Sequence, residues 1–352
     1  MSDSMPASPL DLPAIRAAAR LLEQGELVAF PTETVYGLGA DAEDPQAVAK
    51  IYAAKGRPSN HPVIVHLPPG VDPGYWASAI PGQALALIGA FWPGPLTLIL
   101  KRAPNIPDAV AGGQDTIGLR CPSHPVAQAL LREFRGGKGG VAAPSANRFG
   151  HVSPTTAQHV RDEFGVAPDS PLACVLDGGQ SEVGIESTIL DLSRIATHGP
   201  VLLRPGQVDA LQIAAVIGSV PALPDAAAPR ASGTLEAHYA PHTPVALVEA
   251  DVLHDTLQKL SAHKRRAAVM RRSVPLLQEA AHQLHMPDAA ADYAHALYAA
   301  LRTLDQARDD IILVEAPPTG AEWQGINDRL RRAAHDSSGV LARLLAGQPS
   351  AV

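Results

Sequence analysis

The sequence has few cysteines, few aromatic residues and no long apolar run. Its 352 residues include only Cys121 and Cys174 as cysteines, too few for a disulfide framework or a cysteine-based zinc site. No apolar segment approaches the ~20 residues that span a bilayer. The first residues lack the basic and apolar regions of a signal peptide. We therefore expect a reduced, cytoplasmic protein without a membrane segment.

The chain also lacks a net positive charge and several common catalytic motifs. Its formal net charge is −7, which argues against a global basic field for nucleic acid but leaves room for a local basic cleft. A Walker A pattern is absent, which excludes an ordinary P-loop nucleotide site. The 14 histidines are scattered, so we expect no resident metal. No Ser/His/Asp or Cys/His nucleophile system is recognisable.

Glycine and proline are abundant, at 29 and 33 residues, and the chain is longer than one typical domain. These features predict two turn-rich domains. The expected organisation is a flexible tail at 1–11, a first domain at 12–207, a helix and a Pro/Ala-rich interdomain linker at 208–243, a second domain at 244–345 and a tail at 346–352.

Both domains are expected to be α/β. In the first domain short strands follow one another closely between residues 95 and 205, which favours a mixed open sheet over a regular parallel one. The second domain alternates strands and helices in the manner of a small doubly wound, Rossmann-like domain. Its first strand is not followed by G-x-G-x-x-G, so the dinucleotide-site signal is absent.

A pair of cations, Lys55 and Arg57, follows a predicted helix at 45–54. Such a pair is often only a basic turn that complements the helix dipole. Here it would project toward the same sheet edge as Thr34, which lies in a polar loop after the apolar strand 27–30. Arginine binds phosphate in a bidentate way and lysine acts as a point charge, so the pair also suits a triphosphate.

Further polar side chains lie where other predicted strands or helices end. Each has an ordinary alternative: Arg120 and Arg204 could be rim charges, His66 a hydrogen-bonded core residue, and Ser145 with Asn147 a simple turn. Their shared placement favours a crevice at a sheet edge. The set contains four cations and no acid, so the predicted ligand is anionic. It comprises Thr34, Lys55, Arg57, His66, Arg120, Ser145, Asn147, Ser187 and Arg204.

Several long motifs, in order, resemble the YrdC/Sua5 family of threonylcarbamoyl-adenylate synthases in its two-domain Sua5 form. In the first domain they are FPTETVYGLG (30–39), KGRP (55–58), HPVIVHL (61–67), FWPGPLTLIL (91–100), DTIGLRCPSHP (115–125), APSANRFGHVSPT (143–155), GIESTILDL (184–192) and LLRPG (202–206). HYAPHTP (238–244) and IILVEAPP (311–318) are similar to the longer form.

The resemblance implies a twisted sheet with a concave, basic pocket. It implies a nucleotidyltransferase that condenses L-threonine, bicarbonate and ATP into threonylcarbamoyl-AMP and pyrophosphate. A separate threonylcarbamoyl transferase complex would then modify adenosine 37 of tRNA. Mg²⁺ would arrive with ATP, and direct contact with tRNA is left open. In the Sua5 form the linker folds over the pocket as a lid.

The resemblance also assigns roles to individual residues. The catalytic core carries over to Lys55, Arg57, Ser145 and Asn147. The ATP contacts add His61, Thr116, Ser153, Arg204 and, from the linker, Tyr239. The threonine contacts carry over to Thr34, His66, Arg120, the backbone at Ala143, and Ser187.

Two other functions compete with this one. One is a carbamoyl-AMP-type carbamoyltransferase domain, although that larger family carries zinc-finger cysteines that two cysteines cannot supply. The other is a double-stranded RNA-binding module, against which the net charge of −7 and the lack of aromatic stacking motifs both weigh.

Overall fold

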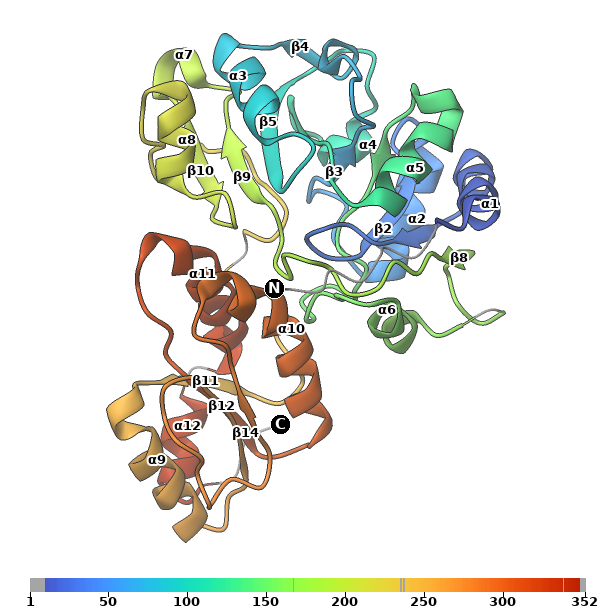
Figure 1. Cartoon of the computed structure of the whole chain (residues 1–352). Helices are drawn as coiled ribbons and strands as arrows, with labels where there is room; N and C mark the ends of the chain where they lie inside the picture. Colours follow the sequence, from blue (N-terminus) through green and yellow to red (C-terminus); the bar gives the residue numbers. More distant parts are fainter. Residues whose placement is uncertain (1–9, 167, 235, 237, 338, 349–352) are drawn as a thin grey trace, which may run out of the picture.

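The computed structural model describes residues 10–166, 168–234, 236, 238–337 and 339–348 as two α/β units (Figure 1). The first unit is built on a mixed sheet of ten strands. Along the sheet lie β10 (Val201–Arg204), β9 (Thr188–Asp191), β5 (Leu96–Arg102), β6 (Thr116–Arg120), β3 (Ile64–His66), β7 (Val141–Ala142), β2 (Gly37–Asp41), β1 (Val28–Phe30) and β8 (Cys174–Val175), with β4 (Ala77–Ala79) paired to β5. The expected mixed sheet is confirmed, because parallel pairs such as β3–β6 adjoin antiparallel pairs such as β5–β6.

Eight helices in the described residues belong to this first unit. They are α1 (Leu12–Glu23), α2 (Pro45–Lys55), α3 (Gly82–Phe91), α4 (Asp108–Ala111), α5 (Pro125–Glu133), α6 (Ala157–Phe164), α7 (Ile195–His198) and α8 (Ala210–Ile217). Sequence signals explain several ends. Asp44 caps α2 by accepting from the amide of Gln46, and Gly56 ends the helix in the left-handed region. That turn fixes the direction in which the chain leaves α2 toward Arg57.

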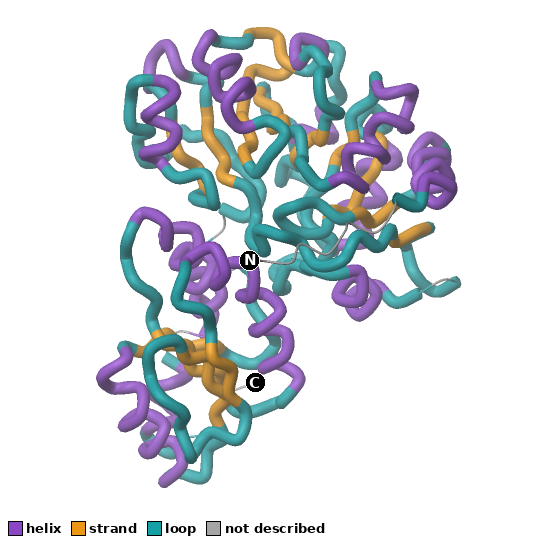
Figure 2. The backbone as a smooth tube through the Cα atoms, viewed as in Figure 1, coloured by secondary structure: helices purple, strands orange, loops and turns teal. Residues whose placement is uncertain are grey.

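The second unit has a four-stranded parallel sheet in the order β11 (Val245–Val248), β14 (Ile311–Glu315), β12 (Ala267–Arg271) and β13 (Gln283–His285). Its helices are α9 (Ala250–Ala262), α10 (Ala290–Gln306), α11 (Gln324–Ala334) and α12 (Val340–Leu345). The expected small α/β domain is confirmed. Helices α10 and α11 lie on the side of this unit that faces the first one (Figures 1 and 2).

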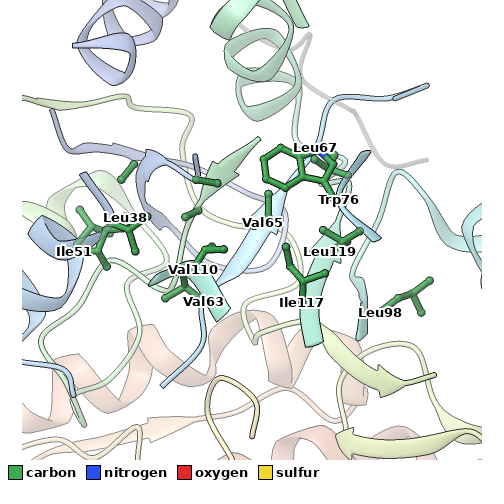
Figure 3. Packing of buried hydrophobic residues seen from close by; sticks show 14 of the residues in the cluster. Leu38, Ile51, Val63, Val65, Leu67, Trp76, Leu98, Val110, Ile117 and Leu119 are labelled. Carbon is green, nitrogen blue, oxygen red and sulfur yellow. The ribbon is translucent and has the colours of Figure 1, made fainter. Parts of the chain in front are cut away.

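Strand alternation separates the core of the first unit from its polar face. Val65 on β3 and Ile117 and Leu119 on β6 point into the main hydrophobic cluster, where Figure 3 shows them near Trp76. Successive side chains of a strand point to opposite faces, so the neighbouring residues of both strands face the other way. Parallel register then sets His66 directly beside Arg120 on that second face.

One segment expected to be a loop is partly a strand. The residues after Phe30 read as polar and turn-prone, but Gly37–Asp41 forms β2 and is buried. The strand packs very closely on its neighbour: a Cβ on Gly39 would lie 2.9 Å from the Phe30 ring and 3.1 Å from the carbonyl oxygen of Val28. Glycine, which sequence patterns associate with turns, is needed here for close approach.

The later part of the linker is packed into the protein, whereas residues 222–227 are exposed. Ser232, His238 and Tyr239 are buried, and isolated bridges join Ala222 to Val201 and Ala240 to His151. Its Pro- and Ala-rich composition predicted a lack of regular structure, and the described residues of 218–243 contain no helix and no named strand. The composition gave no sign of this burial. The family resemblance did, because in the Sua5 form the linker folds over the pocket.

The placement of Leu119 predicts a large loss of stability on truncation. Its side chain is fully buried in the main cluster, so Leu119→Ala should lower the free energy of unfolding by about 2–5 kcal/mol through lost burial and a residual cavity. Urea denaturation followed by tryptophan fluorescence measures this, because Trp76 lies in the same cluster. Leu85→Ala, at a side chain that is 56% exposed, is the control and should change stability by less than about 0.5 kcal/mol. Equal effects of the two changes would contradict the packing described.

Candidate active site

A polar pocket lies on the second face of the sheet, between the strand ends and the linker. Its walls come from the loop after β1, the C-terminal ends of β3 and β6, the segment after β7, the segment before β9, and the linker residues Ser232, Gly233, His238 and Tyr239. The cavity volume is about 40 Å³, space for only a few water molecules. The linker therefore occupies much of the space between these walls.

The pocket brings together most of the residues that the sequence singled out. Nine of the fourteen line it: Thr34, Arg57, His66, Arg120, Ala143, Ser145, Ser187, Arg204 and Tyr239. The other five do not. Lys55, Asn147 and Ser153 are buried outside the lining, His61 is half-buried beside Phe149, and Thr116 lines a small neighbouring cavity. Ser232 and Ile64 line both cavities.

Arg120 is held in place by a carboxylate that sequence reasoning missed. Its Nη2 lies 2.6 Å from Oε1 of Glu33, and both side chains are buried. Its Nη1 donates to Oγ1 of Thr34 at 2.8 Å and its Nε to the carbonyl oxygen of Gly94. The other Glu33 oxygen accepts from the amide of Ser123. Glu33 lies in the same motif as Thr34, but its partner, Arg120, lies far along the chain on β6. Spacing within the motif therefore could not reveal this contact.

His66 is a neutral, buried imidazole. Burial, and then the nearby charge of Arg120, lower its pKa from 6.5 to about 3. Its Nδ1 has no hydrogen-bond partner among the described residues. Oδ1 of Asn147 and Nδ1 of His238 also have no hydrogen-bond partner among the described residues. Buried polar atoms are usually satisfied, and two of these three, on His66 and His238, belong to the pocket lining, where a ligand could pair with them.

Lys55 and Arg57 use backbone carbonyl oxygens as their partners. Nζ of Lys55 donates to the carbonyl oxygen of Ser145 at 2.5 Å and to that of Asn147. Burial, together with the charge of Arg57, holds the Lys55 pKa well below its usual range. Arg57 donates to the carbonyl oxygen of Pro62 at 2.8 Å, and burial lowers its pKa to about 10. Lys55 thus fixes the backbone beneath Ser145, while Arg57 faces the pocket.

The pocket lining also includes an acid, Glu186, which was not among the residues singled out from the sequence. One of its oxygens accepts from the hydroxyl of Ser153, and the other accepts from Tyr298 at 2.9 Å and from Nε of Arg329 at 2.8 Å. Tyr298 and Arg329 belong to the second unit, so a motif in the first unit gives no sign of their contacts with Glu186. Glu186 reads in the sequence as the first residue of an apolar strand and carries no signal of this role.

Arg204 links the pocket wall to the linker. Its guanidinium donates to the carbonyl oxygen of Ser187 at 2.9 Å and to that of Ser232 at 2.8 Å, and it lies 3.5 Å from the hydroxyl of Tyr239. A Cβ at Gly233 would overlap the Tyr239 hydroxyl and lie 2.8 Å from the Arg204 guanidinium. Gly233, which has a positive φ, is thus required where the linker crosses the pocket.

Neither cysteine is activated in this structure. Burial raises the pKa of Cys121 to about 12 and raises that of Cys174, so both remain thiols and neither is an activated nucleophile. Within the described ranges, no cluster of three or more His, Cys, Asp or Glu side chains is arranged to hold a metal ion. Nor does that part of the chain include a helix with the length and apolar character of a membrane span.

Comparison with known proteins shows the family to which the chain belongs. A family model for Sua5, YciO and YrdC proteins, described as "Telomere recombination", matches residues 20–206. The chain belongs to the Sua5/YciO/YrdC family. A second model, described as the C-terminal domain of threonylcarbamoyl-AMP synthase, matches residues 208–335, which identifies the two-domain Sua5 form.

Relatives of the Sua5 form match almost the whole chain. The threonylcarbamoyl-AMP synthase of Pyrococcus abyssi is 37% identical over 91% of this chain and 93% of its own length. That of Bacillus subtilis is 39% identical over 92% and 93%, respectively. The crystal structure of P. abyssi Sua5 complexed with L-threonine superposes with a TM-score of 0.85 at 35% identity, covering 93% of this chain and 96% of that one.

The neutral state of His66 predicts a specific pH dependence of stability. The unfolded chain binds a proton at this residue below pH 6.5, whereas the folded chain does so only near pH 3. Between these values His66 therefore lowers stability by about 1.4 kcal/mol per pH unit as the pH falls. The free energy of unfolding of His66→Gln, relative to the wild type, should rise by that amount per unit from pH 6 to pH 4.

Urea denaturation across this pH range measures the difference. The control is Leu85→Ala, at an exposed side chain that does not titrate, and its difference from the wild type should stay constant. A constant difference for His66→Gln as well would contradict the neutral, buried state of this imidazole.

Proposed function

We propose that this protein is a threonylcarbamoyl-AMP synthase that condenses L-threonine, bicarbonate and ATP, with release of pyrophosphate, in the pocket between the sheet and the linker. The single observation that carries the proposal is the convergence of Thr34, His66, Arg120, Ala143 and Ser187 on one cavity. They come from five separate segments, and the family resemblance alone assigns all five to threonine. The close relatives bear the name of this activity.

The threonine site would use the buried wall formed by β3 and β6. Among the described residues, Arg120 uses three N–H groups in bonds to Glu33, Thr34 and Gly94. A guanidinium has five such groups, so others can serve the carboxylate of the amino acid. Glu33 fixes the orientation of this guanidinium before the ligand arrives. Such preorganisation lowers the entropic cost of binding.

The nucleotide site would lie on the side of Arg57, Ser145, Arg204 and Tyr239. Arg57 and Arg204 are buried and bound mainly to carbonyl oxygens, so they keep their positive charge for a triphosphate. Lys55 supports this side through the carbonyl oxygens of Ser145 and Asn147. Asn147, Ser153, His61 and Thr116 stay predicted contacts. Mg²⁺ would enter with ATP as part of the substrate.

In the reaction the threonine amine forms a C–N bond with the carbon of bicarbonate, and water leaves to give a carbamate. A carbamate oxygen then attacks the α-phosphorus of ATP. The bond from that phosphorus to the pyrophosphate oxygen breaks. The pocket offers no activated cysteine, so positioning and charge stabilisation would supply the rate. Arg57 and Arg204 would stabilise the charge that develops on pyrophosphate. The product would pass in the cytoplasm to a threonylcarbamoyl transferase complex that modifies adenosine 37 of tRNA.

The linker would act as a lid. Small-molecule sites typically have volumes of roughly 300–1,000 Å³, far above the 40 Å³ present here. ATP can therefore enter only when Ser232, His238 and Tyr239 move out of the space that they fill. Their return over bound substrates would shield the unstable carbamate from water.

Release of pyrophosphate from ATP tests the proposed activity. It should require both L-threonine and bicarbonate, and Lys55→Ala should reduce it to background because the backbone at Ser145 and Asn147 loses its support. Lys50→Ala is the matched control: Lys50 lies on the same helix, pairs with Glu26 at the surface and should be dispensable. Turnover with bicarbonate but without threonine would favour the carbamoyltransferase alternative. RNA binding with a steep salt dependence and no turnover would favour the RNA-binding alternative.

Removal of the linker and second unit should impair turnover but leave the first sheet folded. A chain that ends at Pro224 keeps α8, which packs against α3, and loses Ser232, His238 and Tyr239. We expect a cooperative unfolding transition and at least a tenfold lower rate of pyrophosphate release, because the pocket can no longer be closed. Circular dichroism and the release assay measure the two properties. A fully active fragment would exclude the lid role.

A further inference from the structure

The second unit places one buried arginine at the edge of the pocket. Arg329 lies on α11, and its side chain is completely buried. Its Nε donates to Oε2 of Glu186 at 2.8 Å and its Nη2 to the carbonyl oxygen of Glu186 at 3.1 Å. Its Nη1 donates to the carbonyl oxygen of Pro205 at 2.8 Å. Arg329 thus holds both the side chain and the backbone of a residue that lines the pocket.

The backbone around this contact is packed too closely for Arg329 to be an incidental surface pair. A Cβ at Gly325, one turn earlier on α11, would lie 2.9 Å from Ile185 and 3.1 Å from the Cα of Gly206. A side chain at this position would have to push α11 away from the segments that flank Glu186 and Arg204 by a few tenths of an ångström. The Arg329 guanidinium also lies over the ring of Tyr239, 5.4 Å from its centre.

Glu186 would be harmful to an anion site if it had no cationic partner. It lies next to Ser187, whose carbonyl oxygen binds Arg204. Burial opposes its ionisation, but the charges of Arg329 and then Arg204 lower its pKa to about 2, so the carboxylate is ionised. Without Arg329, Arg204 would have to compensate the charge of Glu186, and the remaining negative charge would repel a triphosphate.

We propose that Arg329 is a positioning residue of the active site, which neutralises Glu186 so that the charge of Arg204 stays available to the nucleotide. The inference rests on the proposed function, because it takes ATP as the anion. It makes the second unit part of the site: α11 sets the electrostatic potential of a pocket built on the first unit. Arg329 need not touch the substrates, since it acts through Glu186 and Arg204.

Steady-state kinetics on the full chain tests this role. Arg329→Met should raise the KM for ATP by about tenfold or more, because a buried carboxylate loses its partner, and should raise the KM for threonine much less. Arg329→Lys keeps the charge and should stay within about threefold of the wild type. The double variant Glu186→Gln with Arg329→Met removes the unpaired anion and should recover most of the lost affinity for ATP.

A purely structural contact would behave differently. Arg302→Met is the matched control, since Arg302 on α10 reaches across to Glu163 of the first unit at 2.9 Å without lining the pocket. It should lower thermal stability but leave the KM for ATP unchanged. If Arg329→Met does not fold, the double variant decides: a folded, active enzyme supports the inference and a folded, inactive one overturns it.

Two other results separate the inference from the function on which it rests. A wild-type protein without threonine-dependent pyrophosphate release would overturn the proposed function itself. An active wild type together with an Arg329→Met variant of unchanged KM for ATP, or a double variant no better than that single variant, would overturn only the role of Arg329.

Discussion

Compensation of buried positive charge is the constraint on which the site depends. Four cationic side chains surround the pocket region with exposures between 3% and 7%: Lys55, Arg57, Arg120 and Arg204. Burying an unpaired charge costs several kcal/mol or more. Arg120 is neutralised by a carboxylate, whereas Arg57 and Arg204, which line the pocket, are bound mainly to carbonyl oxygens. Carbonyl partners stabilise a cation without cancelling its charge, so the pocket keeps an attraction for anions that a set of salt bridges would have removed.

The fold could be predicted largely from local sequence patterns. Apolar alternation gave the strands on both sides of the pocket, and caps such as Asp44 and Gly56 gave the helix ends. Close strand spacing gave the mixed sheet. The main error, at Gly37–Asp41, arose because a glycine chosen for close strand contact looks the same in a sequence as one chosen for a turn. Short edge elements such as β13 have too few residues to show a period.

The site could be predicted only where its residues lie in recognisable motifs. His66 and Arg120 end strands that parallel pairing sets side by side, so their meeting follows from the fold class. Glu33 and Glu186 could not be found in this way, because each matters through a partner far along the chain. Glu186 meets Arg329 after 143 residues and across two units. Their importance comes from compensation of charge, which depends on three-dimensional packing.

The close backbone contacts at the boundary between the units limit how the molecule can move. Gly325 on α11 leaves no room beside Gly206, and Gly184, at a positive φ, leaves none beside Ala294 and His295 on α10. A hinge rotation of one unit on the other would have to break both contacts and expose the ion pair between Glu186 and Arg329. If the proposed function holds, substrates would therefore reach the sheet through displacement of the linker residues Ser232, His238 and Tyr239. Under the proposed function, the contacts at Gly325 and Gly184 would then hold the two units together while the linker around Ser232 and Tyr239 moves.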